Sequence, residues 1–205
     1  MKRNSSVSHD EFIWFGDNSG MSFPLFPLAF VFAALVGSVS AAERQLAIDP
    51  AQSRIEVVVK ATVDSFTGRL DVFDPTVKLN DAGEIVGARV AFHFRDVHTG
   101  KAKRDAAMHE WQETERFPDG EFELLSLKRD GDAAAQAVGR LTFHGVSREI
   151  AFPVSLANDA GILAIDGEAP VDVRDFGLPV IRKFGVLKVD PLVRVRFHLQ
   201  GRIAS

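Results

Sequence analysis

Residues 139–154 read GRLTFHGVSREIAFPV, two runs of alternating apolar and polar residues separated by His144 and Gly145. The apolar positions that share a face are Leu141 and Phe143 in the first run and Ile150, Phe152 and Val154 in the second. Alternation with period two on both sides of a short glycine-containing link is typical of an antiparallel hairpin. The stretch therefore predicts two paired strands whose common apolar face must be covered by a core, a partner or a ligand.

The same alternation recurs along most of the chain. It marks further strands over residues 53–61, 66–73, 85–95, 121–128, 162–176 and 192–203. We interpret Pro75 and three short segments as turns. The segments are NDAG (80–83), RDGDAA (129–134) and NDAG (158–161). Gly68 indicates a bulge or a bend, and residues 176–191 form an irregular segment.

Only residues 98–118 break the alternation with helical spacing. Ala107, Met108 and Trp111 fall on one face of a helix, and Phe117-Pro118 ends the run. Lysines and an arginine at the start of this segment oppose the helix dipole, so we expect a short helix that begins near Arg104.

About eight strands with one apolar and one charged face cannot form a flat sheet, because that sheet would leave its apolar face in water and its edges unpaired. Closure into a barrel removes both problems, whereas a two-sheet sandwich removes the first; periodicity does not separate the two. An outer-membrane barrel is excluded, because it would turn the Arg-, Glu- and Lys-rich faces toward lipid.

The first 42 residues differ in composition from the rest. PLFPLAFVFAALVG at 24–37 is an uncharged apolar run, and SVSAA at 38–42 ends in a cleavage pattern. The run is short for a membrane span, so we predict a signal peptide over 1–42, with Met21 as an alternative start; the alternative is an uncleaved membrane anchor. The predicted domain is 43–205, and the expected location is the periplasm.

The composition excludes several classes of function. A net charge of -4 over 205 residues gives no basic patch for nucleic acid, and the absence of cysteine excludes disulfides and thiolate metal sites. The histidines lack metal-ligand spacing, and no nucleophile elbow or phosphate-binding loop is present. We therefore expect neither an enzyme nor a metal site.

Several segments are similar, in the same order, to motifs of one family, the YceI-like periplasmic proteins. They are LAIDPAQSRIEVVVK (46–60), TGKAKRD (99–105), FPDGEFEL (117–124), GRLTFHGVSREIAFPV (139–154) and VRDFG (173–177). The resemblance implies a lipocalin-like, eight-stranded antiparallel β-barrel with a short helix, whose interior holds a long apolar molecule such as a polyisoprenoid or a quinone tail. The chain departs from the family pattern at Leu46, where an aromatic residue is usual, and at Trp111, where smaller residues are frequent.

The candidate ligand-binding residues are those expected to face inward or to frame the opening. The apolar ones are Phe66, Val90, Phe92, Phe94, Met108, Trp111, Phe122, Leu124, Leu141, Phe143, Phe152, Val173, Phe176, Val195 and Phe197. The polar ones are the pairs Arg104-Asp105 and Arg174-Asp175. The chain has 17 phenylalanines and no tyrosine, which suits a dry interior because no phenol hydroxyl needs a partner there.

These observations lead to a hypothesis and an alternative. The hypothesis is a periplasmic carrier whose partner is a hydrophobic small molecule, with no cofactor other than a bound isoprenoid or quinone-like lipid. The alternative is an exported, stress-linked protein that acts through a membrane redox partner, with lipid binding incidental. Both the hypothesis and the alternative are compatible with transient membrane contact and with a homodimer.

Overall fold

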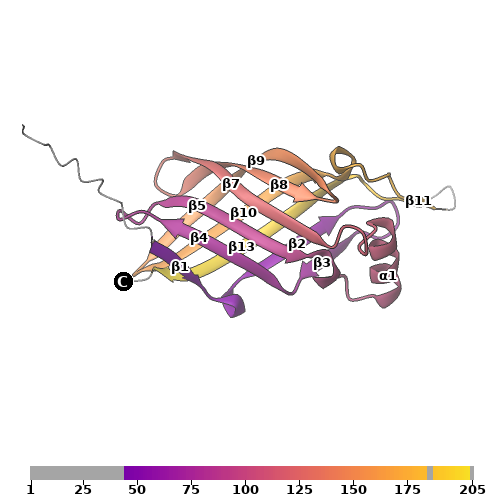
Figure 1. The fold of residues 1–205 in the computed structure, drawn as a ribbon, viewed down its shortest axis with the longest axis horizontal. Coiled ribbons are helices and arrows are strands. Elements are labelled where there is room, and N and C mark those ends of the chain that lie inside the picture. The colour runs from indigo at the N-terminus through magenta and orange to yellow at the C-terminus, as the bar shows by residue number, and fades with distance from the viewer. Residues whose placement is uncertain (1–43, 184–186, 204–205) are drawn as a thin grey trace, which may run out of the picture. The chain divides into compact units, whose positions relative to one another are not determined.

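The computed structural model describes residues 44–183 and 187–203, in which one short α-helix accompanies a set of antiparallel strands (Figure 1). The signal peptide predicted over 1–42 lies outside the described residues. The strands are β1 Arg44–Ile48, β2 Arg54–Val59, β3 Phe66–Leu70, β4 Phe73–Leu79, β5 Ile85–His93, β6 Val97–His98, β7 Asp119–Asp130, β8 Ala134–Phe143, β9 Val146–Asp159, β10 Ile162–Asp172, β11 Arg182–Lys183, β12 Leu187–Lys188 and β13 Leu192–Ile203. The helix α1 covers Ala102–Trp111.

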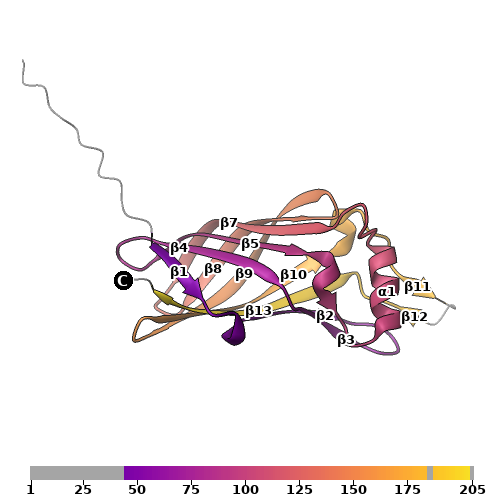
Figure 2. The same cartoon turned by 60° about the horizontal axis from the view of Figure 1, so that its bottom comes forward.

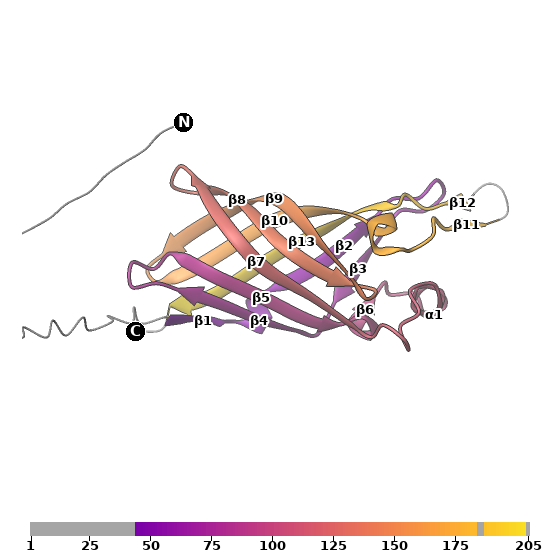
Figure 3. The same ribbon diagram turned by 45° about the horizontal axis from the view of Figure 1, so that its top comes forward.

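The strands close into a barrel of eight positions (Figures 1 and 3). Closure comes from β1, which pairs with β4 on one side and with β13 on the other, where Leu46 lies opposite Ile203. At three of the eight places in the barrel wall, two consecutive strands follow one another along the same line. These pairs are β1 and β2, β3 and β4, and β5 and β6. The predicted eight-stranded antiparallel barrel is confirmed, and a two-sheet sandwich is excluded.

The hairpin of residues 139–154 forms as predicted. Phe143 pairs with Val146 across a two-residue turn in which His144 has φ 51° and Gly145 has φ 70°. Positive φ at both turn residues matches the twist of the adjoining strands. The His144 Nδ1 donates a hydrogen bond to the Phe176 carbonyl at 2.9 Å, which attaches the turn to the segment that follows β10.

Four details differ from the sequence interpretation. Pro75 lies inside β4 and not in a turn. Gly68 pairs regularly with Val57, and the chain bends instead between β3 and β4. The strand predicted over 162–176 ends at Asp172, because the Asp172 carboxylate accepts a hydrogen bond from the Arg174 amide and starts a 3₁₀ turn over Val173–Phe176. The irregular segment 176–191 contains the small hairpin of β11 and β12.

The helix begins at Ala102, two residues before the expected start, and lies at one end of the barrel with the β11–β12 hairpin (Figure 2). We call this end the mouth; it also carries the β2–β3 loop and the 144–145 turn. The opposite end, the floor, carries the turns at 80–84, 131–133 and 160–161. Among the residues that the structure describes, no helix has the length and apolarity needed to cross a membrane.

Candidate functional site

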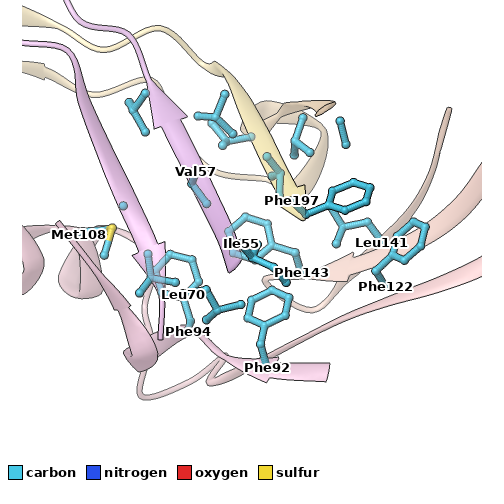
Figure 4. Close-up of a pocket in the computed structure, with 18 of the residues that line it drawn as sticks. Ile55, Val57, Leu70, Phe92, Phe94, Met108, Phe122, Leu141, Phe143 and Phe197 are labelled. Carbon is cyan, nitrogen blue, oxygen red and sulfur yellow. The ribbon is translucent and has the colours of Figure 1, made fainter. Parts of the chain in front are cut away.

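The barrel encloses a cavity of about 1230 Å³ (Figure 4). Its wall is made by the inward-facing residues of the strands, and these are aliphatic or aromatic because every second residue of each strand is apolar. The cavity reaches the surface at the mouth, since Val63 borders it and is also 72% exposed. The interior is therefore an open-ended apolar pocket and not a fully packed core.

A cluster of tightly packed aliphatic side chains closes the floor. Val77 and Leu79 have exposures of 1% and 0%, and they pack in the same cluster as Leu46 from β1. The other buried aliphatic members of the cluster are Ala135, Ala137, Val154, Leu156, Leu163, Ile165, Ala169 and Leu199. Leu46, the departure from the family pattern, thus contributes to the floor, which leaves the mouth as the route into the cavity.

Phenylalanine side chains from β7, β8, β9, β13 and the 3₁₀ turn Phe94–Asp96 form two groups along the cavity. In the middle of the barrel, the Phe152 ring lies 5.6 Å from Phe122 and 5.8 Å from Phe197 between ring centroids. Nearer the mouth, the Phe143 ring lies 5.5 Å from the Phe94 ring. Figure 4 shows Phe92, Phe94, Phe122, Phe143 and Phe197 around the cavity.

The polar side chains that border the cavity all lie at the mouth. They are Asp64, Thr99, Lys101, Lys103, Arg104, Glu110, Arg182 and Asp190. The Asp64 carboxylate accepts hydrogen bonds from Arg104 at 3.1 Å and from Lys101 at 3.4 Å. The Arg104 guanidinium also lies 4.2 Å from the Phe66 ring centroid, a cation–π contact. The mouth can therefore solvate or pair with a polar head, whereas the interior cannot.

Two sets of hydrogen bonds fix α1 beside the mouth. The Asp105 carboxylate accepts from the Thr99 amide at 2.9 Å and from the Thr99 hydroxyl at 2.5 Å, and the Trp111 indole donates to the Pro179 carbonyl at 2.9 Å. Burial raises the pKa of the Asp105 carboxyl, but the Thr99 hydrogen bonds and two nearby histidines outweigh this and hold the pKa below its usual value. Asp105 is thus ionised at neutral pH and anchors the helix.

Fifteen of the nineteen candidate residues border the cavity. They are Phe66, Val90, Phe92, Phe94, Arg104, Met108, Trp111, Phe122, Leu124, Leu141, Phe143, Phe152, Val173, Val195 and Phe197. The structure thus brings together side chains from β3, β5, β7, β8, β9 and β13, one from each of the 3₁₀ turns Phe94–Asp96 and Val173–Phe176, and three from α1.

Four candidate residues lie away from the cavity: Asp105, Arg174, Asp175 and Phe176. Asp105 is turned toward Thr99. Arg174 forms an ion pair with Asp172 at 2.5 Å, which lowers the pKa of that carboxyl and raises the pKa of the arginine. Phe176 is 1% exposed and packs against Phe143 without bordering the cavity. Arg174, Asp175 and Phe176 therefore do not frame the mouth, although Val173 in the same turn borders the cavity.

The sequence interpretation missed a part of the cavity wall and most of the mouth. The further wall residues include Ile55, Val57, Val59, Leu70, Leu127, Ile150, Val154, Leu156, Ile165, Val171 and Val193. The period-two alternation could have identified most of them. Asp64, by contrast, carries no local signal, because its partner Arg104 is 40 residues away in the chain.

Glu168, an acidic residue on the outside of the barrel, is paired with two arginines. Glu168 on β10 accepts a hydrogen bond from Arg196 at 2.6 Å and lies 3.5 Å from Arg194. The Arg196 hydrogen bond, together with both charges, keeps the pKa of Glu168 below its usual value. In residues 44–183 and 187–203, no three His, Asp or Glu side chains gather as a metal site would require.

Comparisons with known proteins agree with this geometry. The family model described as a YceI-like domain matches residues 46–201. A comparison with curated proteins gives no match. Among solved structures, Burkholderia cenocepacia BcnA is similar with a TM-score of 0.67 and 20% identity over 75% of this chain and 99% of that one.

Two further solved structures show the same fold. A polyisoprenoid binding domain from Saccharophagus degradans, described as implicated in plant cell wall breakdown, has a TM-score of 0.61 and 20% identity over 80% of this chain and 99% of that one. The Campylobacter jejuni YceI protein has a TM-score of 0.60 and 14% identity over 70% of this chain and 88% of that one.

Proposed function

Because the chain belongs to the family of YceI-like domains, we propose that it is a carrier that holds one long-tailed amphiphile, such as an isoprenoid, in its barrel. The observation that carries the proposal is the cavity, which is apolar throughout its depth and has its polar residues at one end. Its volume of about 1230 Å³ exceeds the roughly 300–1,000 Å³ of ordinary small-molecule pockets, which suits a long ligand.

The apolar wall supplies enough free energy for binding without help from polar groups. Burial of one methylene group contributes about 0.8 kcal/mol, so one isoprene unit contributes about 4 kcal/mol before costs. Micromolar affinity requires a binding free energy of about 8 kcal/mol after the association cost of several kcal/mol has been subtracted. A tail of a few isoprene units satisfies this requirement, and affinity rises with tail length until the cavity is full.

The polar head of the ligand stays at the mouth. Lys101, Lys103, Arg104 and Arg182 lie there beside Asp64, Glu110 and Asp190, so that both signs of charge are available to a head group. The similar domain from Saccharophagus degradans is named a polyisoprenoid binding domain, which supports an isoprenoid as the ligand proposed here. The ligand is held and released unchanged, so the proposed activity is not enzymatic and needs no cofactor.

The proposed place of action is the periplasm, which rests on the signal peptide expected over residues 1–42. Long-tailed amphiphiles are poorly soluble in water, so a periplasmic carrier collects them from a membrane. Transient contact of the mouth with a membrane surface is the route by which the cavity would be loaded.

The test is to purify the protein without delipidation and to analyse it by native mass spectrometry. A mass increment of one lipid per protein, identified by fragmentation, is the expected result. The delipidated protein should then take up polyprenols or quinones and gain thermal stability from them. Absence of any bound lipid, together with no uptake by the delipidated protein, would remove the proposal.

A further inference from the structure

Three glycines of the barrel wall are covered by phenylalanine rings from a neighbouring strand. A Cβ atom added to Gly120 would lie 2.2 Å from the Phe92 ring, one added to Gly139 would lie 2.2 Å from the Phe122 ring, and one added to Gly167 would lie 2.4 Å from the Phe197 ring. Side-chain carbons do not approach this closely, so only glycine permits each ring to lie on the wall.

Strand register explains the pairing. Gly120 is the direct partner of Phe92 between β7 and β5, and Gly167 is the direct partner of Phe197 between β10 and β13. Paired residues of adjacent strands point to the same face, here the inside of the barrel. None of the three glycines has a positive φ, so the backbone does not need glycine there; the close approach of the ring does.

The three rings border the cavity. Phe92, Phe122 and Phe197, with Phe152 between the last two, form what we call the belt. Further toward the floor, the same strands contribute Ala88, Leu124, Leu127, Val154, Leu156 and Leu199, which also border the cavity. The belt therefore lies between two parts of one cavity, which we call the outer chamber, at the mouth, and the inner chamber, above the floor.

We propose that the three Phe–Gly pairs hold the belt open and so set how long a tail the cavity binds. The inference rests on the proposed function and deepens it: the ligands of this site are amphiphiles whose tail passes the belt into the inner chamber. A ring that lies on a glycine takes little of the cross-section. A ring displaced from the wall has one free direction, into the cavity, and there it blocks the inner chamber.

The three glycines differ in which atoms an added Cβ would meet, so they are not equally suitable for testing the proposal. At Gly120 and Gly167, the nearest atoms to an added Cβ belong only to the phenylalanine ring. At Gly139, the Glu123 carbonyl oxygen would also lie at 2.8 Å, so that an alanine there would strain the wall itself. Gly120→Ala and Gly167→Ala, singly and together, are therefore the informative variants.

The experiment measures the affinity of the delipidated full chain for geraniol, farnesol and geranylgeraniol, which carry two, three and four isoprene units. In the unmodified protein, affinity rises along this series. In the double glycine variant, geranylgeraniol should bind about a hundredfold more weakly, because each methylene kept out of the inner chamber costs about fourfold. Geraniol, which fits the outer chamber, should change little.

Gly87→Ala is the matched control, because Gly87 lies on β5 and an added Cβ would meet only Lys78, at 3.6 Å. Phe197→Leu in the Gly167→Ala background should restore binding of the long alcohol by removing the displaced ring. Equal loss for all three alcohols, or no loss in a variant with an unchanged thermal melt, would overturn the role of the belt and leave the carrier proposal standing. Failure of the unmodified protein to bind any of them would overturn both.

Discussion

Replacement of Ala88 by phenylalanine should weaken ligand binding and at the same time stabilise the empty protein. Ala88 lies on β5, opposite Val77, and borders the cavity between the belt and the floor. The added phenyl ring occupies about the space of one isoprene unit. The ligand then loses about 4 kcal/mol of burial, which corresponds to an affinity about a hundredfold to a thousandfold weaker.

The effect on stability has the opposite sign. In a filled core, an added ring causes overpacking and costs about 1–3 kcal/mol. Here the ring enters empty apolar space, so burial of its surface should raise the unfolding free energy of the delipidated protein by about 1.5–3 kcal/mol. Weaker ligand binding together with unfolding at a higher urea concentration would show that the added ring fills a cavity that is empty in the unmodified protein.

The assay combines urea unfolding of the delipidated protein with the dissociation constant of geranylgeraniol, measured by displacement of a fluorescent naphthalene probe. Ala91→Phe is the matched control, because Ala91 lies on the same strand and points away from the cavity. Destabilisation by Ala88→Phe would mean that the interior is already filled. Unchanged affinity in a folded variant would mean that the tail does not reach this depth. An unchanged physiological activity despite lost binding would favour action through a membrane redox partner.

Two further predictions concern the parts that hold the mouth and the hairpin. Asp105→Asn should lower the unfolding free energy by about 1–2 kcal/mol at neutral pH, because Thr99 loses charge-assisted hydrogen bonds. Since the pKa of Asp105 is lowered by folding, its contribution is fully present above the unfolded-state value of about 3.9 and is lost as the pH falls through the folded-state value. Urea unfolding of the two proteins should therefore converge below that pH, and a gap that persists there would contradict the role of the ionised carboxylate. Gly145→Ala should destabilise by about 2 kcal/mol, because φ is 70° and a Cβ would lie 2.8 Å from the Phe117 ring. Gly161→Ala, with φ 82° and open space around it, should cost about 1 kcal/mol, and equal losses would show that the Phe117 contact is unimportant.

The alternation of apolar and polar residues predicted strands with one consistent inner face, and the resemblance to the YceI-like family then favoured a closed barrel over a two-sheet sandwich. The alternation placed Val90, Phe92 and Phe94 correctly, since consecutive inward residues are two apart. The interruptions between β1 and β2 and between β3 and β4 were not predicted. They arise where the Asp49 carboxylate caps a 3₁₀ turn over Pro50–Gln52 and where the chain bends after Leu70, and such local hydrogen bonds leave little trace in a periodic pattern.

The mouth was harder to predict than the wall, because its geometry is tertiary. Arg104 was identified, but its partner Asp64 lies on the β2–β3 loop and meets the helix only after the barrel has closed. Phe176 was assigned inward by its hydrophobicity alone. The 3₁₀ turn that starts at Asp172 places it against Phe143, where it is buried without bordering the cavity. Residue type does not distinguish these two buried environments.

The distribution of packing in the barrel explains how a protein with a large void remains folded. An empty cavity forfeits dispersion contacts along its lining, so an apolar void lowers stability. In this chain the loss is confined to the part between mouth and floor. The ladder of the closed sheet satisfies the backbone along the whole wall, and the floor cluster around Val77 and Leu79 is packed to 1% exposure or less. Substitutions at the floor should therefore reduce stability in both the empty and the loaded protein. Substitutions at Gly120 and Gly167 should act mainly on the loaded one, because a displaced ring enters space that only the ligand uses.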